Sequence, residues 1–345
     1  MNISQENFGT LNGQDVTLFK LQTKSGFEIS CIDYGCIITR ILSPNKNGQL
    51  ENIVLGYDTL EEYLTCSNYF GAVIGRVAGR IEGGFFELDG KEFQLHKNDA
   101  NNHLHGGSRG FNSVIWKSKV IENHHDEGTI EFKYHSADGE EGYPGNVEVV
   151  VRYTLNNQDE LTIHYSATSD KDTIMNLTNH TYFNLSGDLN EDVLNHSLKL
   201  KSNKFLELNH DMIPTGKLIN VEGTSFDFRD RKKLSEGVND PHEQNLLVGK
   251  GYDHPFILED YPEIELSSEG RKLTVETSEP CVVLYTGNSI SEGFKIREVP
   301  SKKYLGVCLE TQKHPNAINQ PEFPSVVLSE NTPYESKTRY KFQTR

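Results

Sequence analysis

A carboxylate and an imidazole stand in two segments whose residue types suit a ligand-binding cleft. Glu310 ends the apolar run of VCLETQ and precedes a loop rich in turn residues, so we expect its carboxylate to face a cleft from the end of a strand. His180 lies in NLTNHTYFNLSG, among side-chain amides and hydroxyls. A lone histidine in such a loop is often structural, but this density of amides and hydroxyls is what a sugar-binding surface uses. The two segments therefore favour a site for a polyhydroxyl ligand.

Further histidines, an aspartate and two arginines offer additional chemistry. His103 and His105 in NNHLHGG are two residues apart, and such a pair could hold a metal ion or could cap a turn. No HExxH motif or cysteine cluster completes a ligand set, so we expect no metal here. Asp253 in GYDHPF is either a turn-former or a positioned carboxylate. Arg76 and Arg80 in GRVAGRI are interpreted, from charge alone, as surface arginines.

Composition and missing motifs exclude several classes of function. The formal net charge of -16 repels phosphate backbones and anionic lipid, which argues against nucleic-acid and membrane partners. No apolar run approaches the roughly 18 residues that a spanning helix needs. The sequence has neither a glycine-rich phosphate loop after a strand nor a G-x-S-x-G motif, so we expect no nucleotide cofactor and no α/β serine hydrolase.

The cysteines and the N-terminus indicate a cytoplasmic protein. No CxxC pair is present, the number of cysteines is odd, and we expect reduced, buried thiols. The N-terminus lacks a basic segment followed by an apolar one, so we expect no secretory signal. The cysteines are Cys31, Cys36, Cys66, Cys281 and Cys308.

The elements that must position these groups are strands. Apolar residues alternate with polar ones over 145–155, Asn156–Asp159 supplies a turn, and the alternation resumes at Leu161, which predicts a long antiparallel hairpin. Further strands are predicted at Phe27–Ile32, Val114–Val120, Thr129–Tyr134, Leu198–Leu200, Leu273–Thr277, Val282–Tyr285, Gly306–Glu310 and Val326–Ser329. Short helices are expected at Leu60–Thr65 and Gln244–Val248. One large all-β domain with two packed sheets follows, and the alternative is two β-domains joined near 215–245.

The order of these segments resembles one known family. GRVAGRI, NNHLHGG, NLTNHTYFNLSG, GYDHPF and VCLETQ, together with YTGN at Tyr285–Asn288 and the C-terminal SENTPYESKTRYKF, are similar to the aldose 1-epimerase (galactose mutarotase) family over residues 8 to 343. The resemblance implies a large antiparallel β-sandwich of the galactose mutarotase-like type, a supersandwich, with residues 1–345 as one catalytic domain. It also implies a monosaccharide substrate such as galactose or glucose, and neither a metal nor another cofactor.

The resemblance also assigns roles to residues. Glu310 would be the general base and His180 the general acid in opening and closing the sugar ring, and His105 would stabilise charge near the ring oxygen. Arg80 and Asp253 would hold the sugar. Because Asp253 and Glu310 should lie near His180, we expect them to raise the pKa of its imidazole.

Two positions depart from the family pattern. Gly79 replaces the usual Asn, and Val283 replaces a common Gln. Both usual residues would touch sugar hydroxyls, so we expect weaker sugar binding and expect Gly79→Asn to tighten it.

Two other functions compete with anomer interconversion. Asp253 and Glu310 could be the carboxylate pair of a glycoside hydrolase, or the amides and aromatics could serve a non-catalytic sugar-binding module. A hexose-phosphate epimerase would need several cationic side chains at the phosphate, and the acidic composition argues against it.

Overall fold

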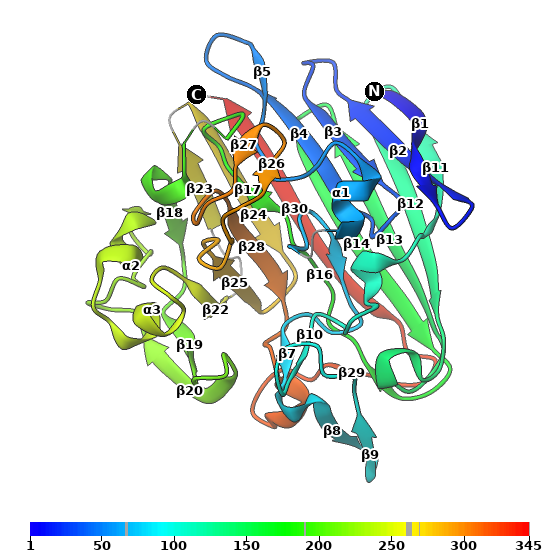
Figure 1. The fold of residues 1–345 in the computed structure, drawn as a ribbon, viewed down its shortest axis with the longest axis vertical. Coiled ribbons are helices and arrows are strands. Elements are labelled where there is room, and N and C mark those ends of the chain that lie inside the picture. The colour runs from blue at the N-terminus through cyan, green and yellow to red at the C-terminus, as the bar shows by residue number, and fades with distance from the viewer. Residues whose placement is uncertain (66–67, 190, 260–263, 269, 345) are drawn as a thin grey trace.

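The computed structural model describes residues 1–65, 68–189, 191–259, 264–268 and 270–344, and strands dominate this part of the chain (Figure 1). A five-stranded antiparallel sheet, here the N-terminal sheet, opens the chain. In spatial order its strands are β1 (Asn2–Leu11), β2 (Gln14–Gln22), β3 (Glu28–Ile32), β4 (Ile38–Pro44) and β5 (Leu50–Asn52).

A nine-stranded antiparallel sheet, here the central sheet, combines segments from both halves of the described chain. Its strands are, in spatial order, β11 (Lys117–Asn123), β12 (Glu127–Ser136), β13 (Val147–Asn156), β14 (Glu160–Ser169), β30 (Tyr334–Thr344), β24 (Arg271–Thr277), β23 (Ile264–Ser268), β18 (Ser197–Leu200) and β21 (Lys232–Lys233). The predicted hairpin is confirmed as β13 and β14, and buried residues alternate with more exposed ones along both strands. The C-terminal strand β30 lies in the middle of this sheet and so joins its two halves (Figure 1).

A six-stranded antiparallel sheet, here the site sheet, carries most of the predicted site residues. Its strands are, in spatial order, β17 (Tyr182–Phe183), β28 (Val307–Gln312), β25 (Cys281–Tyr285), β22 (Asp253–Ile257), β19 (Lys204–Leu208) and β20 (Pro214–Asn220). The remaining strands of the described chain form two-stranded pairs: β7 (Arg80–Ile81) with β10 (His103–Leu104), β6 (Val73–Ile74) with β16 (Thr178–Asn179), β8 (Phe85–Leu88) with β9 (Lys91–Gln94), β15 (Thr173–Ile174) with β29 (Val327–Leu328), and β26 (Lys295–Ile296) with β27 (Val299–Pro300).

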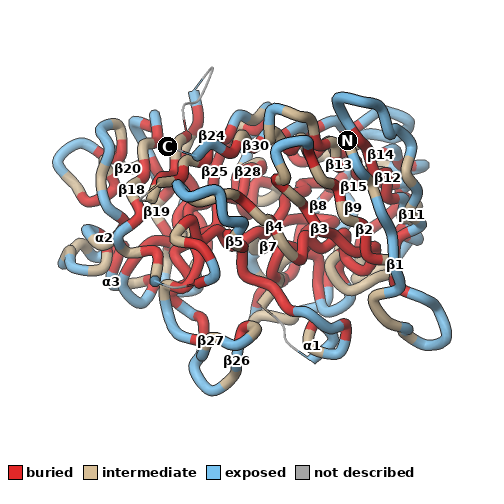
Figure 2. Tube along the Cα trace, turned by 90° about the horizontal axis from the view of Figure 1, so that it is seen from above, coloured by how far each residue is buried: buried red, intermediate tan, exposed pale blue. Residues whose placement is uncertain are grey.

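The N-terminal and site sheets pack on the same side of the central sheet. Phe342 of β30 lies 5.0 Å from Phe27, just before β3, and 6.4 Å from Phe183 of β17, measured between ring centroids. Phe19 of β2 meets Phe132 of β12 edge to face at 6.1 Å. These contacts form one large buried cluster between the layers, and the buried interior is visible in Figure 2. Burial of so many alternating apolar side chains is what stabilises the layered arrangement.

Helices are short in the described chain. They are α1 (Leu60–Thr65), α2 (Ser235–Asn239) and α3 (Glu243–Leu247), with 3₁₀ turns at Glu82–Gly84, Phe111–Ser113, Glu140–Gly142, Val193–Asn195 and Ala317–Asn319. The prediction for α1 is confirmed, α3 begins and ends one residue earlier than expected, and α2 was not predicted. Among the described helices, none is long and apolar enough to cross a membrane.

Two of these sequence-based expectations differ from the structure, and a third is confirmed for the described residues. The strand expected at Val114–Val120 runs instead over Lys117–Asn123, because Val114 flanks the 3₁₀ turn at Phe111–Ser113. Arg76 is not a surface residue, since it is 2% exposed and donates to Ser136 Oγ and to the carbonyl oxygens of Ser136, Ala137 and Pro144. Four of the cysteines are free and buried as expected, whereas Cys66 lies outside the described residues.

Candidate active site

A pocket of about 230 Å³ lies over the site sheet and is closed on one side by the β7–β10 pair. All five residues to which the family resemblance assigned roles line it: Arg80, His105, His180, Asp253 and Glu310. Its remaining lining residues are Asn68, Tyr69, Gly79, Leu104, Tyr182, Leu208, Met212, Pro214, Pro255, Val283, Tyr285, Ser289, Gln312 and Pro315. This volume lies below the roughly 300–1,000 Å³ typical of pockets for drug-sized ligands, so it suits one small molecule.

Glu310 lies on a strand that is paired on both sides. β28 pairs with β17 and β25, and Val283 of β25 lies directly opposite Glu310. Alternation along the strand places Cys308 and Glu310 on one face of β28. Glu310 is only 3% exposed, and its carboxylate meets the ring of His180.

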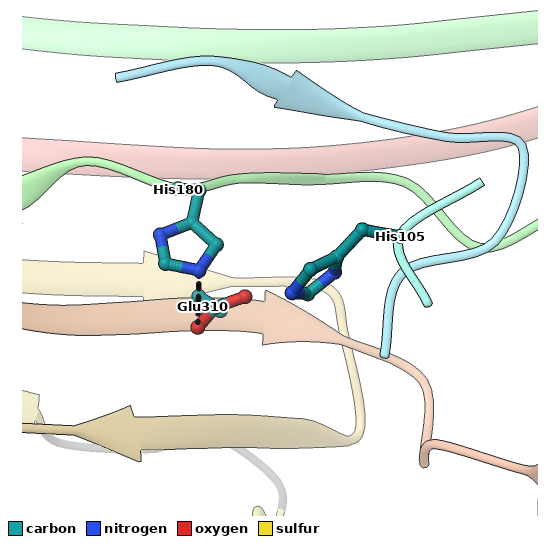
Figure 3. A group of neighbouring side chains, drawn as sticks. All are labelled: His105, His180 and Glu310. Atoms are coloured by element: carbon teal, nitrogen blue, oxygen red, sulfur yellow. Dashed lines mark ion pairs between the residues drawn. The ribbon is translucent and has the colours of Figure 1, made fainter. Parts of the chain in front are cut away.

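His180 lies between β16 and β17 and contacts both of these β28 residues. Its Nε2 is 3.5 Å from Glu310 Oε1, and its Nδ1 is 3.5 Å from Cys308 Sγ. The imidazole lies between two phenol rings, with centroid distances of 5.8 Å to Tyr69 and 4.9 Å to Tyr182, both stacked at 26°. The ring is therefore fixed both in plane and in rotation, with one edge toward Glu310 (Figure 3).

The opposite wall of the pocket, here called the arch, consists of residues 79–81 and 99–105 around the β7–β10 pair. His105 has a left-handed backbone (φ 53°), and its Nδ1 accepts a hydrogen bond of 3.2 Å from the Gly79 N–H. Leu104 pairs with Arg80, whose Nε donates to Asp99 Oδ2 at 2.7 Å. The rings of His105 and His180 meet edge to face at 5.3 Å, so the arch brings a second imidazole to the first (Figure 3).

Burial shifts the pKa values of the acid–base pair in opposite directions. It lowers the pKa of His180 to about 4, which contradicts the expectation that neighbouring carboxylates would raise it. Burial, and secondly the nearby charge of Asp253, raise the pKa of Glu310 well above its usual range. The expectation failed because desolvation of an imidazole that is only 4% exposed is the dominant effect on its pKa.

The other titratable groups of the pocket are also shifted by burial. Burial raises the pKa of Asp253 to about 6, while Arg80 lowers it and Asp99 raises it. Burial, then the neighbouring His180 and Arg80, lower the pKa of His105 well below its usual range. At neutral pH, Asp253 is therefore ionised and His105 is neutral.

The amides around His180 do not form a sugar-binding surface as the sequence suggested. Asn176 bonds to the Lys313 backbone, Asn179 donates to the Gly71 carbonyl, and Asn184 donates to the Leu305 carbonyl. Their side chains are buried and satisfy backbone groups that the irregular segment leaves unpaired. Of this segment, only His180 and Tyr182 line the pocket.

His103 and Gly79 are both residues of the arch, and the surroundings of each show what it does there. His103 is fully buried and bridges the His96 carbonyl oxygen and the Tyr143 hydroxyl, each at 2.6 Å, so it supports the arch from behind. Gly79 has φ 78°, and a Cβ placed there would lie 2.8 Å from Pro315 Cβ. Asn could not occupy this position without a shift of Pro315.

Several residues that line the pocket or hold its lining residues were not predicted from the sequence. Asp99 holds Arg80, although its segment NDANN resembles an ordinary turn. Tyr69 and Tyr182 enclose the imidazole of His180, and lone tyrosines carry no motif that would reveal this. Gln312 lines the pocket two positions after Glu310, and the alternation along β28 could have identified it.

One cluster of potential metal ligands is found among the described residues. Ligand atoms of His105, His180 and Glu310 lie within 4.8 Å of one another (Figure 3). The Gly79 N–H, however, donates to Nδ1 of His105, which places the proton of this neutral ring on Nε2. A metal ligand needs an unprotonated nitrogen, so His105 cannot offer Nε2 without breaking that contact.

The fold places the chain among the galactose mutarotase-like β-sandwiches. The crystal structure of galactose 1-epimerase from Lactobacillus acidophilus superimposes with a TM-score of 0.89 at 29% sequence identity, covering 99% of both chains. This confirms the predicted antiparallel supersandwich.

Sequence comparison specifies the family. The family model for aldose 1-epimerase matches residues 17–341. Galactose mutarotase of Bos taurus is 39% identical over 350 residues, covering 99% of each chain, and aldose 1-epimerase of Haemophilus influenzae is 34% identical over 349 residues, covering 99% of this chain and 100% of that protein. The chain therefore belongs to the aldose 1-epimerase family. It is an isomerase that interconverts the α and β anomers of a monosaccharide.

Proposed function

We propose that Glu310 and His180 interconvert the anomers of hexoses such as galactose and glucose by general base and general acid catalysis. The observation that carries the proposal is the contact of 3.5 Å between His180 Nε2 and Glu310 Oε1 at a pocket sized for one monosaccharide. The names of the galactose mutarotase relatives support galactose as one substrate.

Ring opening needs two proton transfers. The carboxylate of Glu310 takes the proton of the C1 hydroxyl, a C=O bond forms at C1, and the bond between C1 and the ring oxygen breaks. The ring oxygen takes its proton from Nε2 of the protonated His180. The open aldehyde rotates about its C1–C2 bond, and the reverse transfers close the ring on the other face. Each positioned group can contribute roughly 10²–10⁴-fold.

The pKa shifts of the pair favour transfer in the direction that ring opening needs. Burial makes protonated His180 a stronger acid and ionised Glu310 a stronger base than in water. Ring opening starts from the ion-paired form of the two groups, which the low pKa of His180 makes a minor form at neutral pH, and it ends with both groups neutral. The pocket disfavours buried charge, so it stabilises the neutral His180 and neutral Glu310 that are present once the sugar ring is open.

The remaining pocket groups suit binding roles. Nε2 of His105 carries the ring proton and can donate to the developing charge on the ring oxygen. Among the described residues, the guanidinium of Arg80 donates to Asp99 through Nε, and its terminal amino groups can then donate to sugar hydroxyls. Ionised Asp253 can accept from further hydroxyls.

The remaining assignments concern the whole chain. We propose that residues 1–345 form one catalytic domain, because the central sheet joins strands from both halves of the chain and its face supports one large core cluster. We also propose a cytoplasmic location, which the free, buried thiols of Cys31, Cys36, Cys281 and Cys308 support.

Polarimetry on freshly dissolved α-galactose and α-glucose tests this function. We expect the purified protein to accelerate the approach to anomeric equilibrium for both sugars. An aryl galactoside and an aryl glucoside serve as parallel substrates, and we expect no release of the aryl group. Release of the aryl group would instead support a glycoside hydrolase, and binding without acceleration would support a sugar-binding module.

A further inference from the structure

Both ring nitrogens of His180 face side chains of a single strand. Cys308 Sγ lies 3.5 Å from Nδ1, and Glu310 Oε1 lies 3.5 Å from Nε2. The two side chains are two residues apart on β28 and so project from the same face. The imidazole spans this i, i+2 pair, and the stacked rings of Tyr69 and Tyr182 restrict its tilt.

Proton donation at Nε2 depends on what happens at Nδ1. A neutral imidazole carries one ring proton, and the partner of each nitrogen decides which nitrogen holds it. For His180 to give a proton from Nε2 and take it back there, the other proton must remain on Nδ1. A hydrogen-bond acceptor at Nδ1 favours this arrangement, whereas a donor would oppose it.

The two histidines of the pocket differ in this respect. Nδ1 of His105 receives the backbone N–H of Gly79, a group that can only donate, so the proton of His105 is on Nε2. Nδ1 of His180 faces a thiol, whose sulfur can accept. Cys308 is fully buried, and burial raises the pKa of its thiol well above the usual range, so it stays neutral.

We propose that Cys308 is a positioning residue: its Sγ accepts the Nδ1–H of His180 and so reserves Nε2 for proton exchange with the sugar. The proposal rests on the role proposed above for His180. The titratable groups that face His180 from the surrounding elements are Tyr69, His105, Tyr182, Tyr285, Cys308 and Glu310.

Substitution of the thiol tests the proposal by kinetics. We expect Cys308→Ala to lower kcat roughly 2–13-fold, the range for one neutral hydrogen bond, with KM nearly unchanged. Cys308→Ser keeps an acceptor and should stay within about twofold of the wild-type kcat. Cys31→Ala is the matched control, because Cys31 is equally buried but lies in the N-terminal sheet. Equal losses in the Ala and Ser variants, or in Cys308→Ala and Cys31→Ala, would overturn the proposal.

A spectroscopic measurement separates this role from the acid role of His180. In ¹⁵N-labelled wild-type protein, with His180 assigned by difference from His180→Gln, we expect a protonated Nδ1 and a bare Nε2 in the neutral ring. Cys308→Ala should shift this ring toward a mixture of tautomers, and Cys308→Ser should restore the wild-type signals. A bare Nδ1 in the wild type would overturn the role of Cys308 even if His180 is the acid. Full activity of His180→Gln would overturn the acid role whatever the tautomer.

Discussion

The two walls of the pocket hold their side chains in different ways. On the site sheet, β28 pairs with β17 at Val307 and Cys308 and with β25 through Glu310, so the backbone of Glu310 is held in place. The arch rests on two-residue strands, and both Gly79 and His105 have left-handed backbones. Proton transfer depends on distances of a few tenths of an ångström, whereas binding by long side chains tolerates more adjustment. A change at Glu310 on β28 should therefore act mainly on kcat, and a change at Arg80 on the arch mainly on KM.

Glu310→Gln tests the site-sheet half of this comparison and should have the largest effect. The variant keeps the shape of the side chain and removes the base, so we expect kcat to fall roughly 10²–10⁴-fold with little change in KM. Glu279→Gln is the control, because Glu279 is also buried but lies outside the pocket. Retention of more than about a tenth of the activity would remove Glu310 from the role of base.

Arg80→Gln tests the arch. Loss of a charged donor to sugar hydroxyls should raise KM roughly 10–100-fold, with a smaller effect on kcat, since hydrogen bonds to charged groups contribute about 1.5–3 kcal/mol. Arg109→Gln, at an exposed arginine outside the pocket, should change neither parameter. If kcat falls further than KM rises, the arch takes part in the chemical step and the proposed division between the walls is wrong.

The same difference between the walls explains what could be predicted from the sequence. Alternation along strands is visible in one sequence, so the hairpin of β13 and β14 and the position of Glu310 on a strand were predicted correctly. The expected end of that strand at Glu310 was wrong, because β28 continues to Gln312. The burial of Asn176 and Asn179 was not predicted, because a loop residue that satisfies distant backbone groups leaves no local pattern. The assembly of the arch on the site sheet came from the family resemblance alone.

The prediction that the pKa of His180 is raised failed for a related physical reason. The direction of this pKa shift depends on the competition between nearby charges and desolvation, and the sequence shows which residues are charged but not how deeply the ring is buried. The Tyr69 and Tyr182 rings that bury it come from separate segments of the chain.

Asp253 should give the acid limb of the pH profile. Its pKa is raised to about 6, so the carboxylate is ionised above that pH and becomes neutral below it. If the ionised form binds the sugar, kcat/KM falls up to about tenfold for each pH unit below 6. Asp253→Asn should remove this limb. Because the raised pKa disfavours the charged form in the folded state, Asp253→Asn should also be more stable than the wild type at pH 7, and this difference should shrink as the pH falls through 6. An unchanged acid limb in Asp253→Asn would assign it to another group.

Gly79→Asn separates a lost sugar contact from a packing requirement. A side chain at Gly79 meets Pro315, so we expect a lower Tm and a KM that is unchanged or higher, contrary to the tightening suggested by the sequence. Gly83→Asn is the matched control: Gly83 also has a positive φ of 64°, but the nearest atom to an added Cβ is 4.0 Å away. We expect Gly79→Asn to lose roughly 1–3 kcal/mol more stability than Gly83→Asn. A lower KM at unchanged Tm would show that Pro315 yields and that the amide reaches the sugar.

Removal of metal ions should have the smallest effect, although the described residues include a cluster of two imidazoles and a carboxylate. His105 Nε2 keeps its proton as long as Gly79 donates to Nδ1, and the proposed ring opening uses proton transfer alone. We therefore expect activity to survive dialysis against EDTA. Added zinc also tests the hydrogen bond between Gly79 and His105. A metal bound by all three residues would have to break this hydrogen bond and displace the sugar. Zinc should then inhibit only at concentrations well above those that saturate ordinary zinc sites. Loss of activity on chelation, with recovery on addition of zinc or manganese, would show that the arch supplies a metal ligand and that its role is not confined to binding.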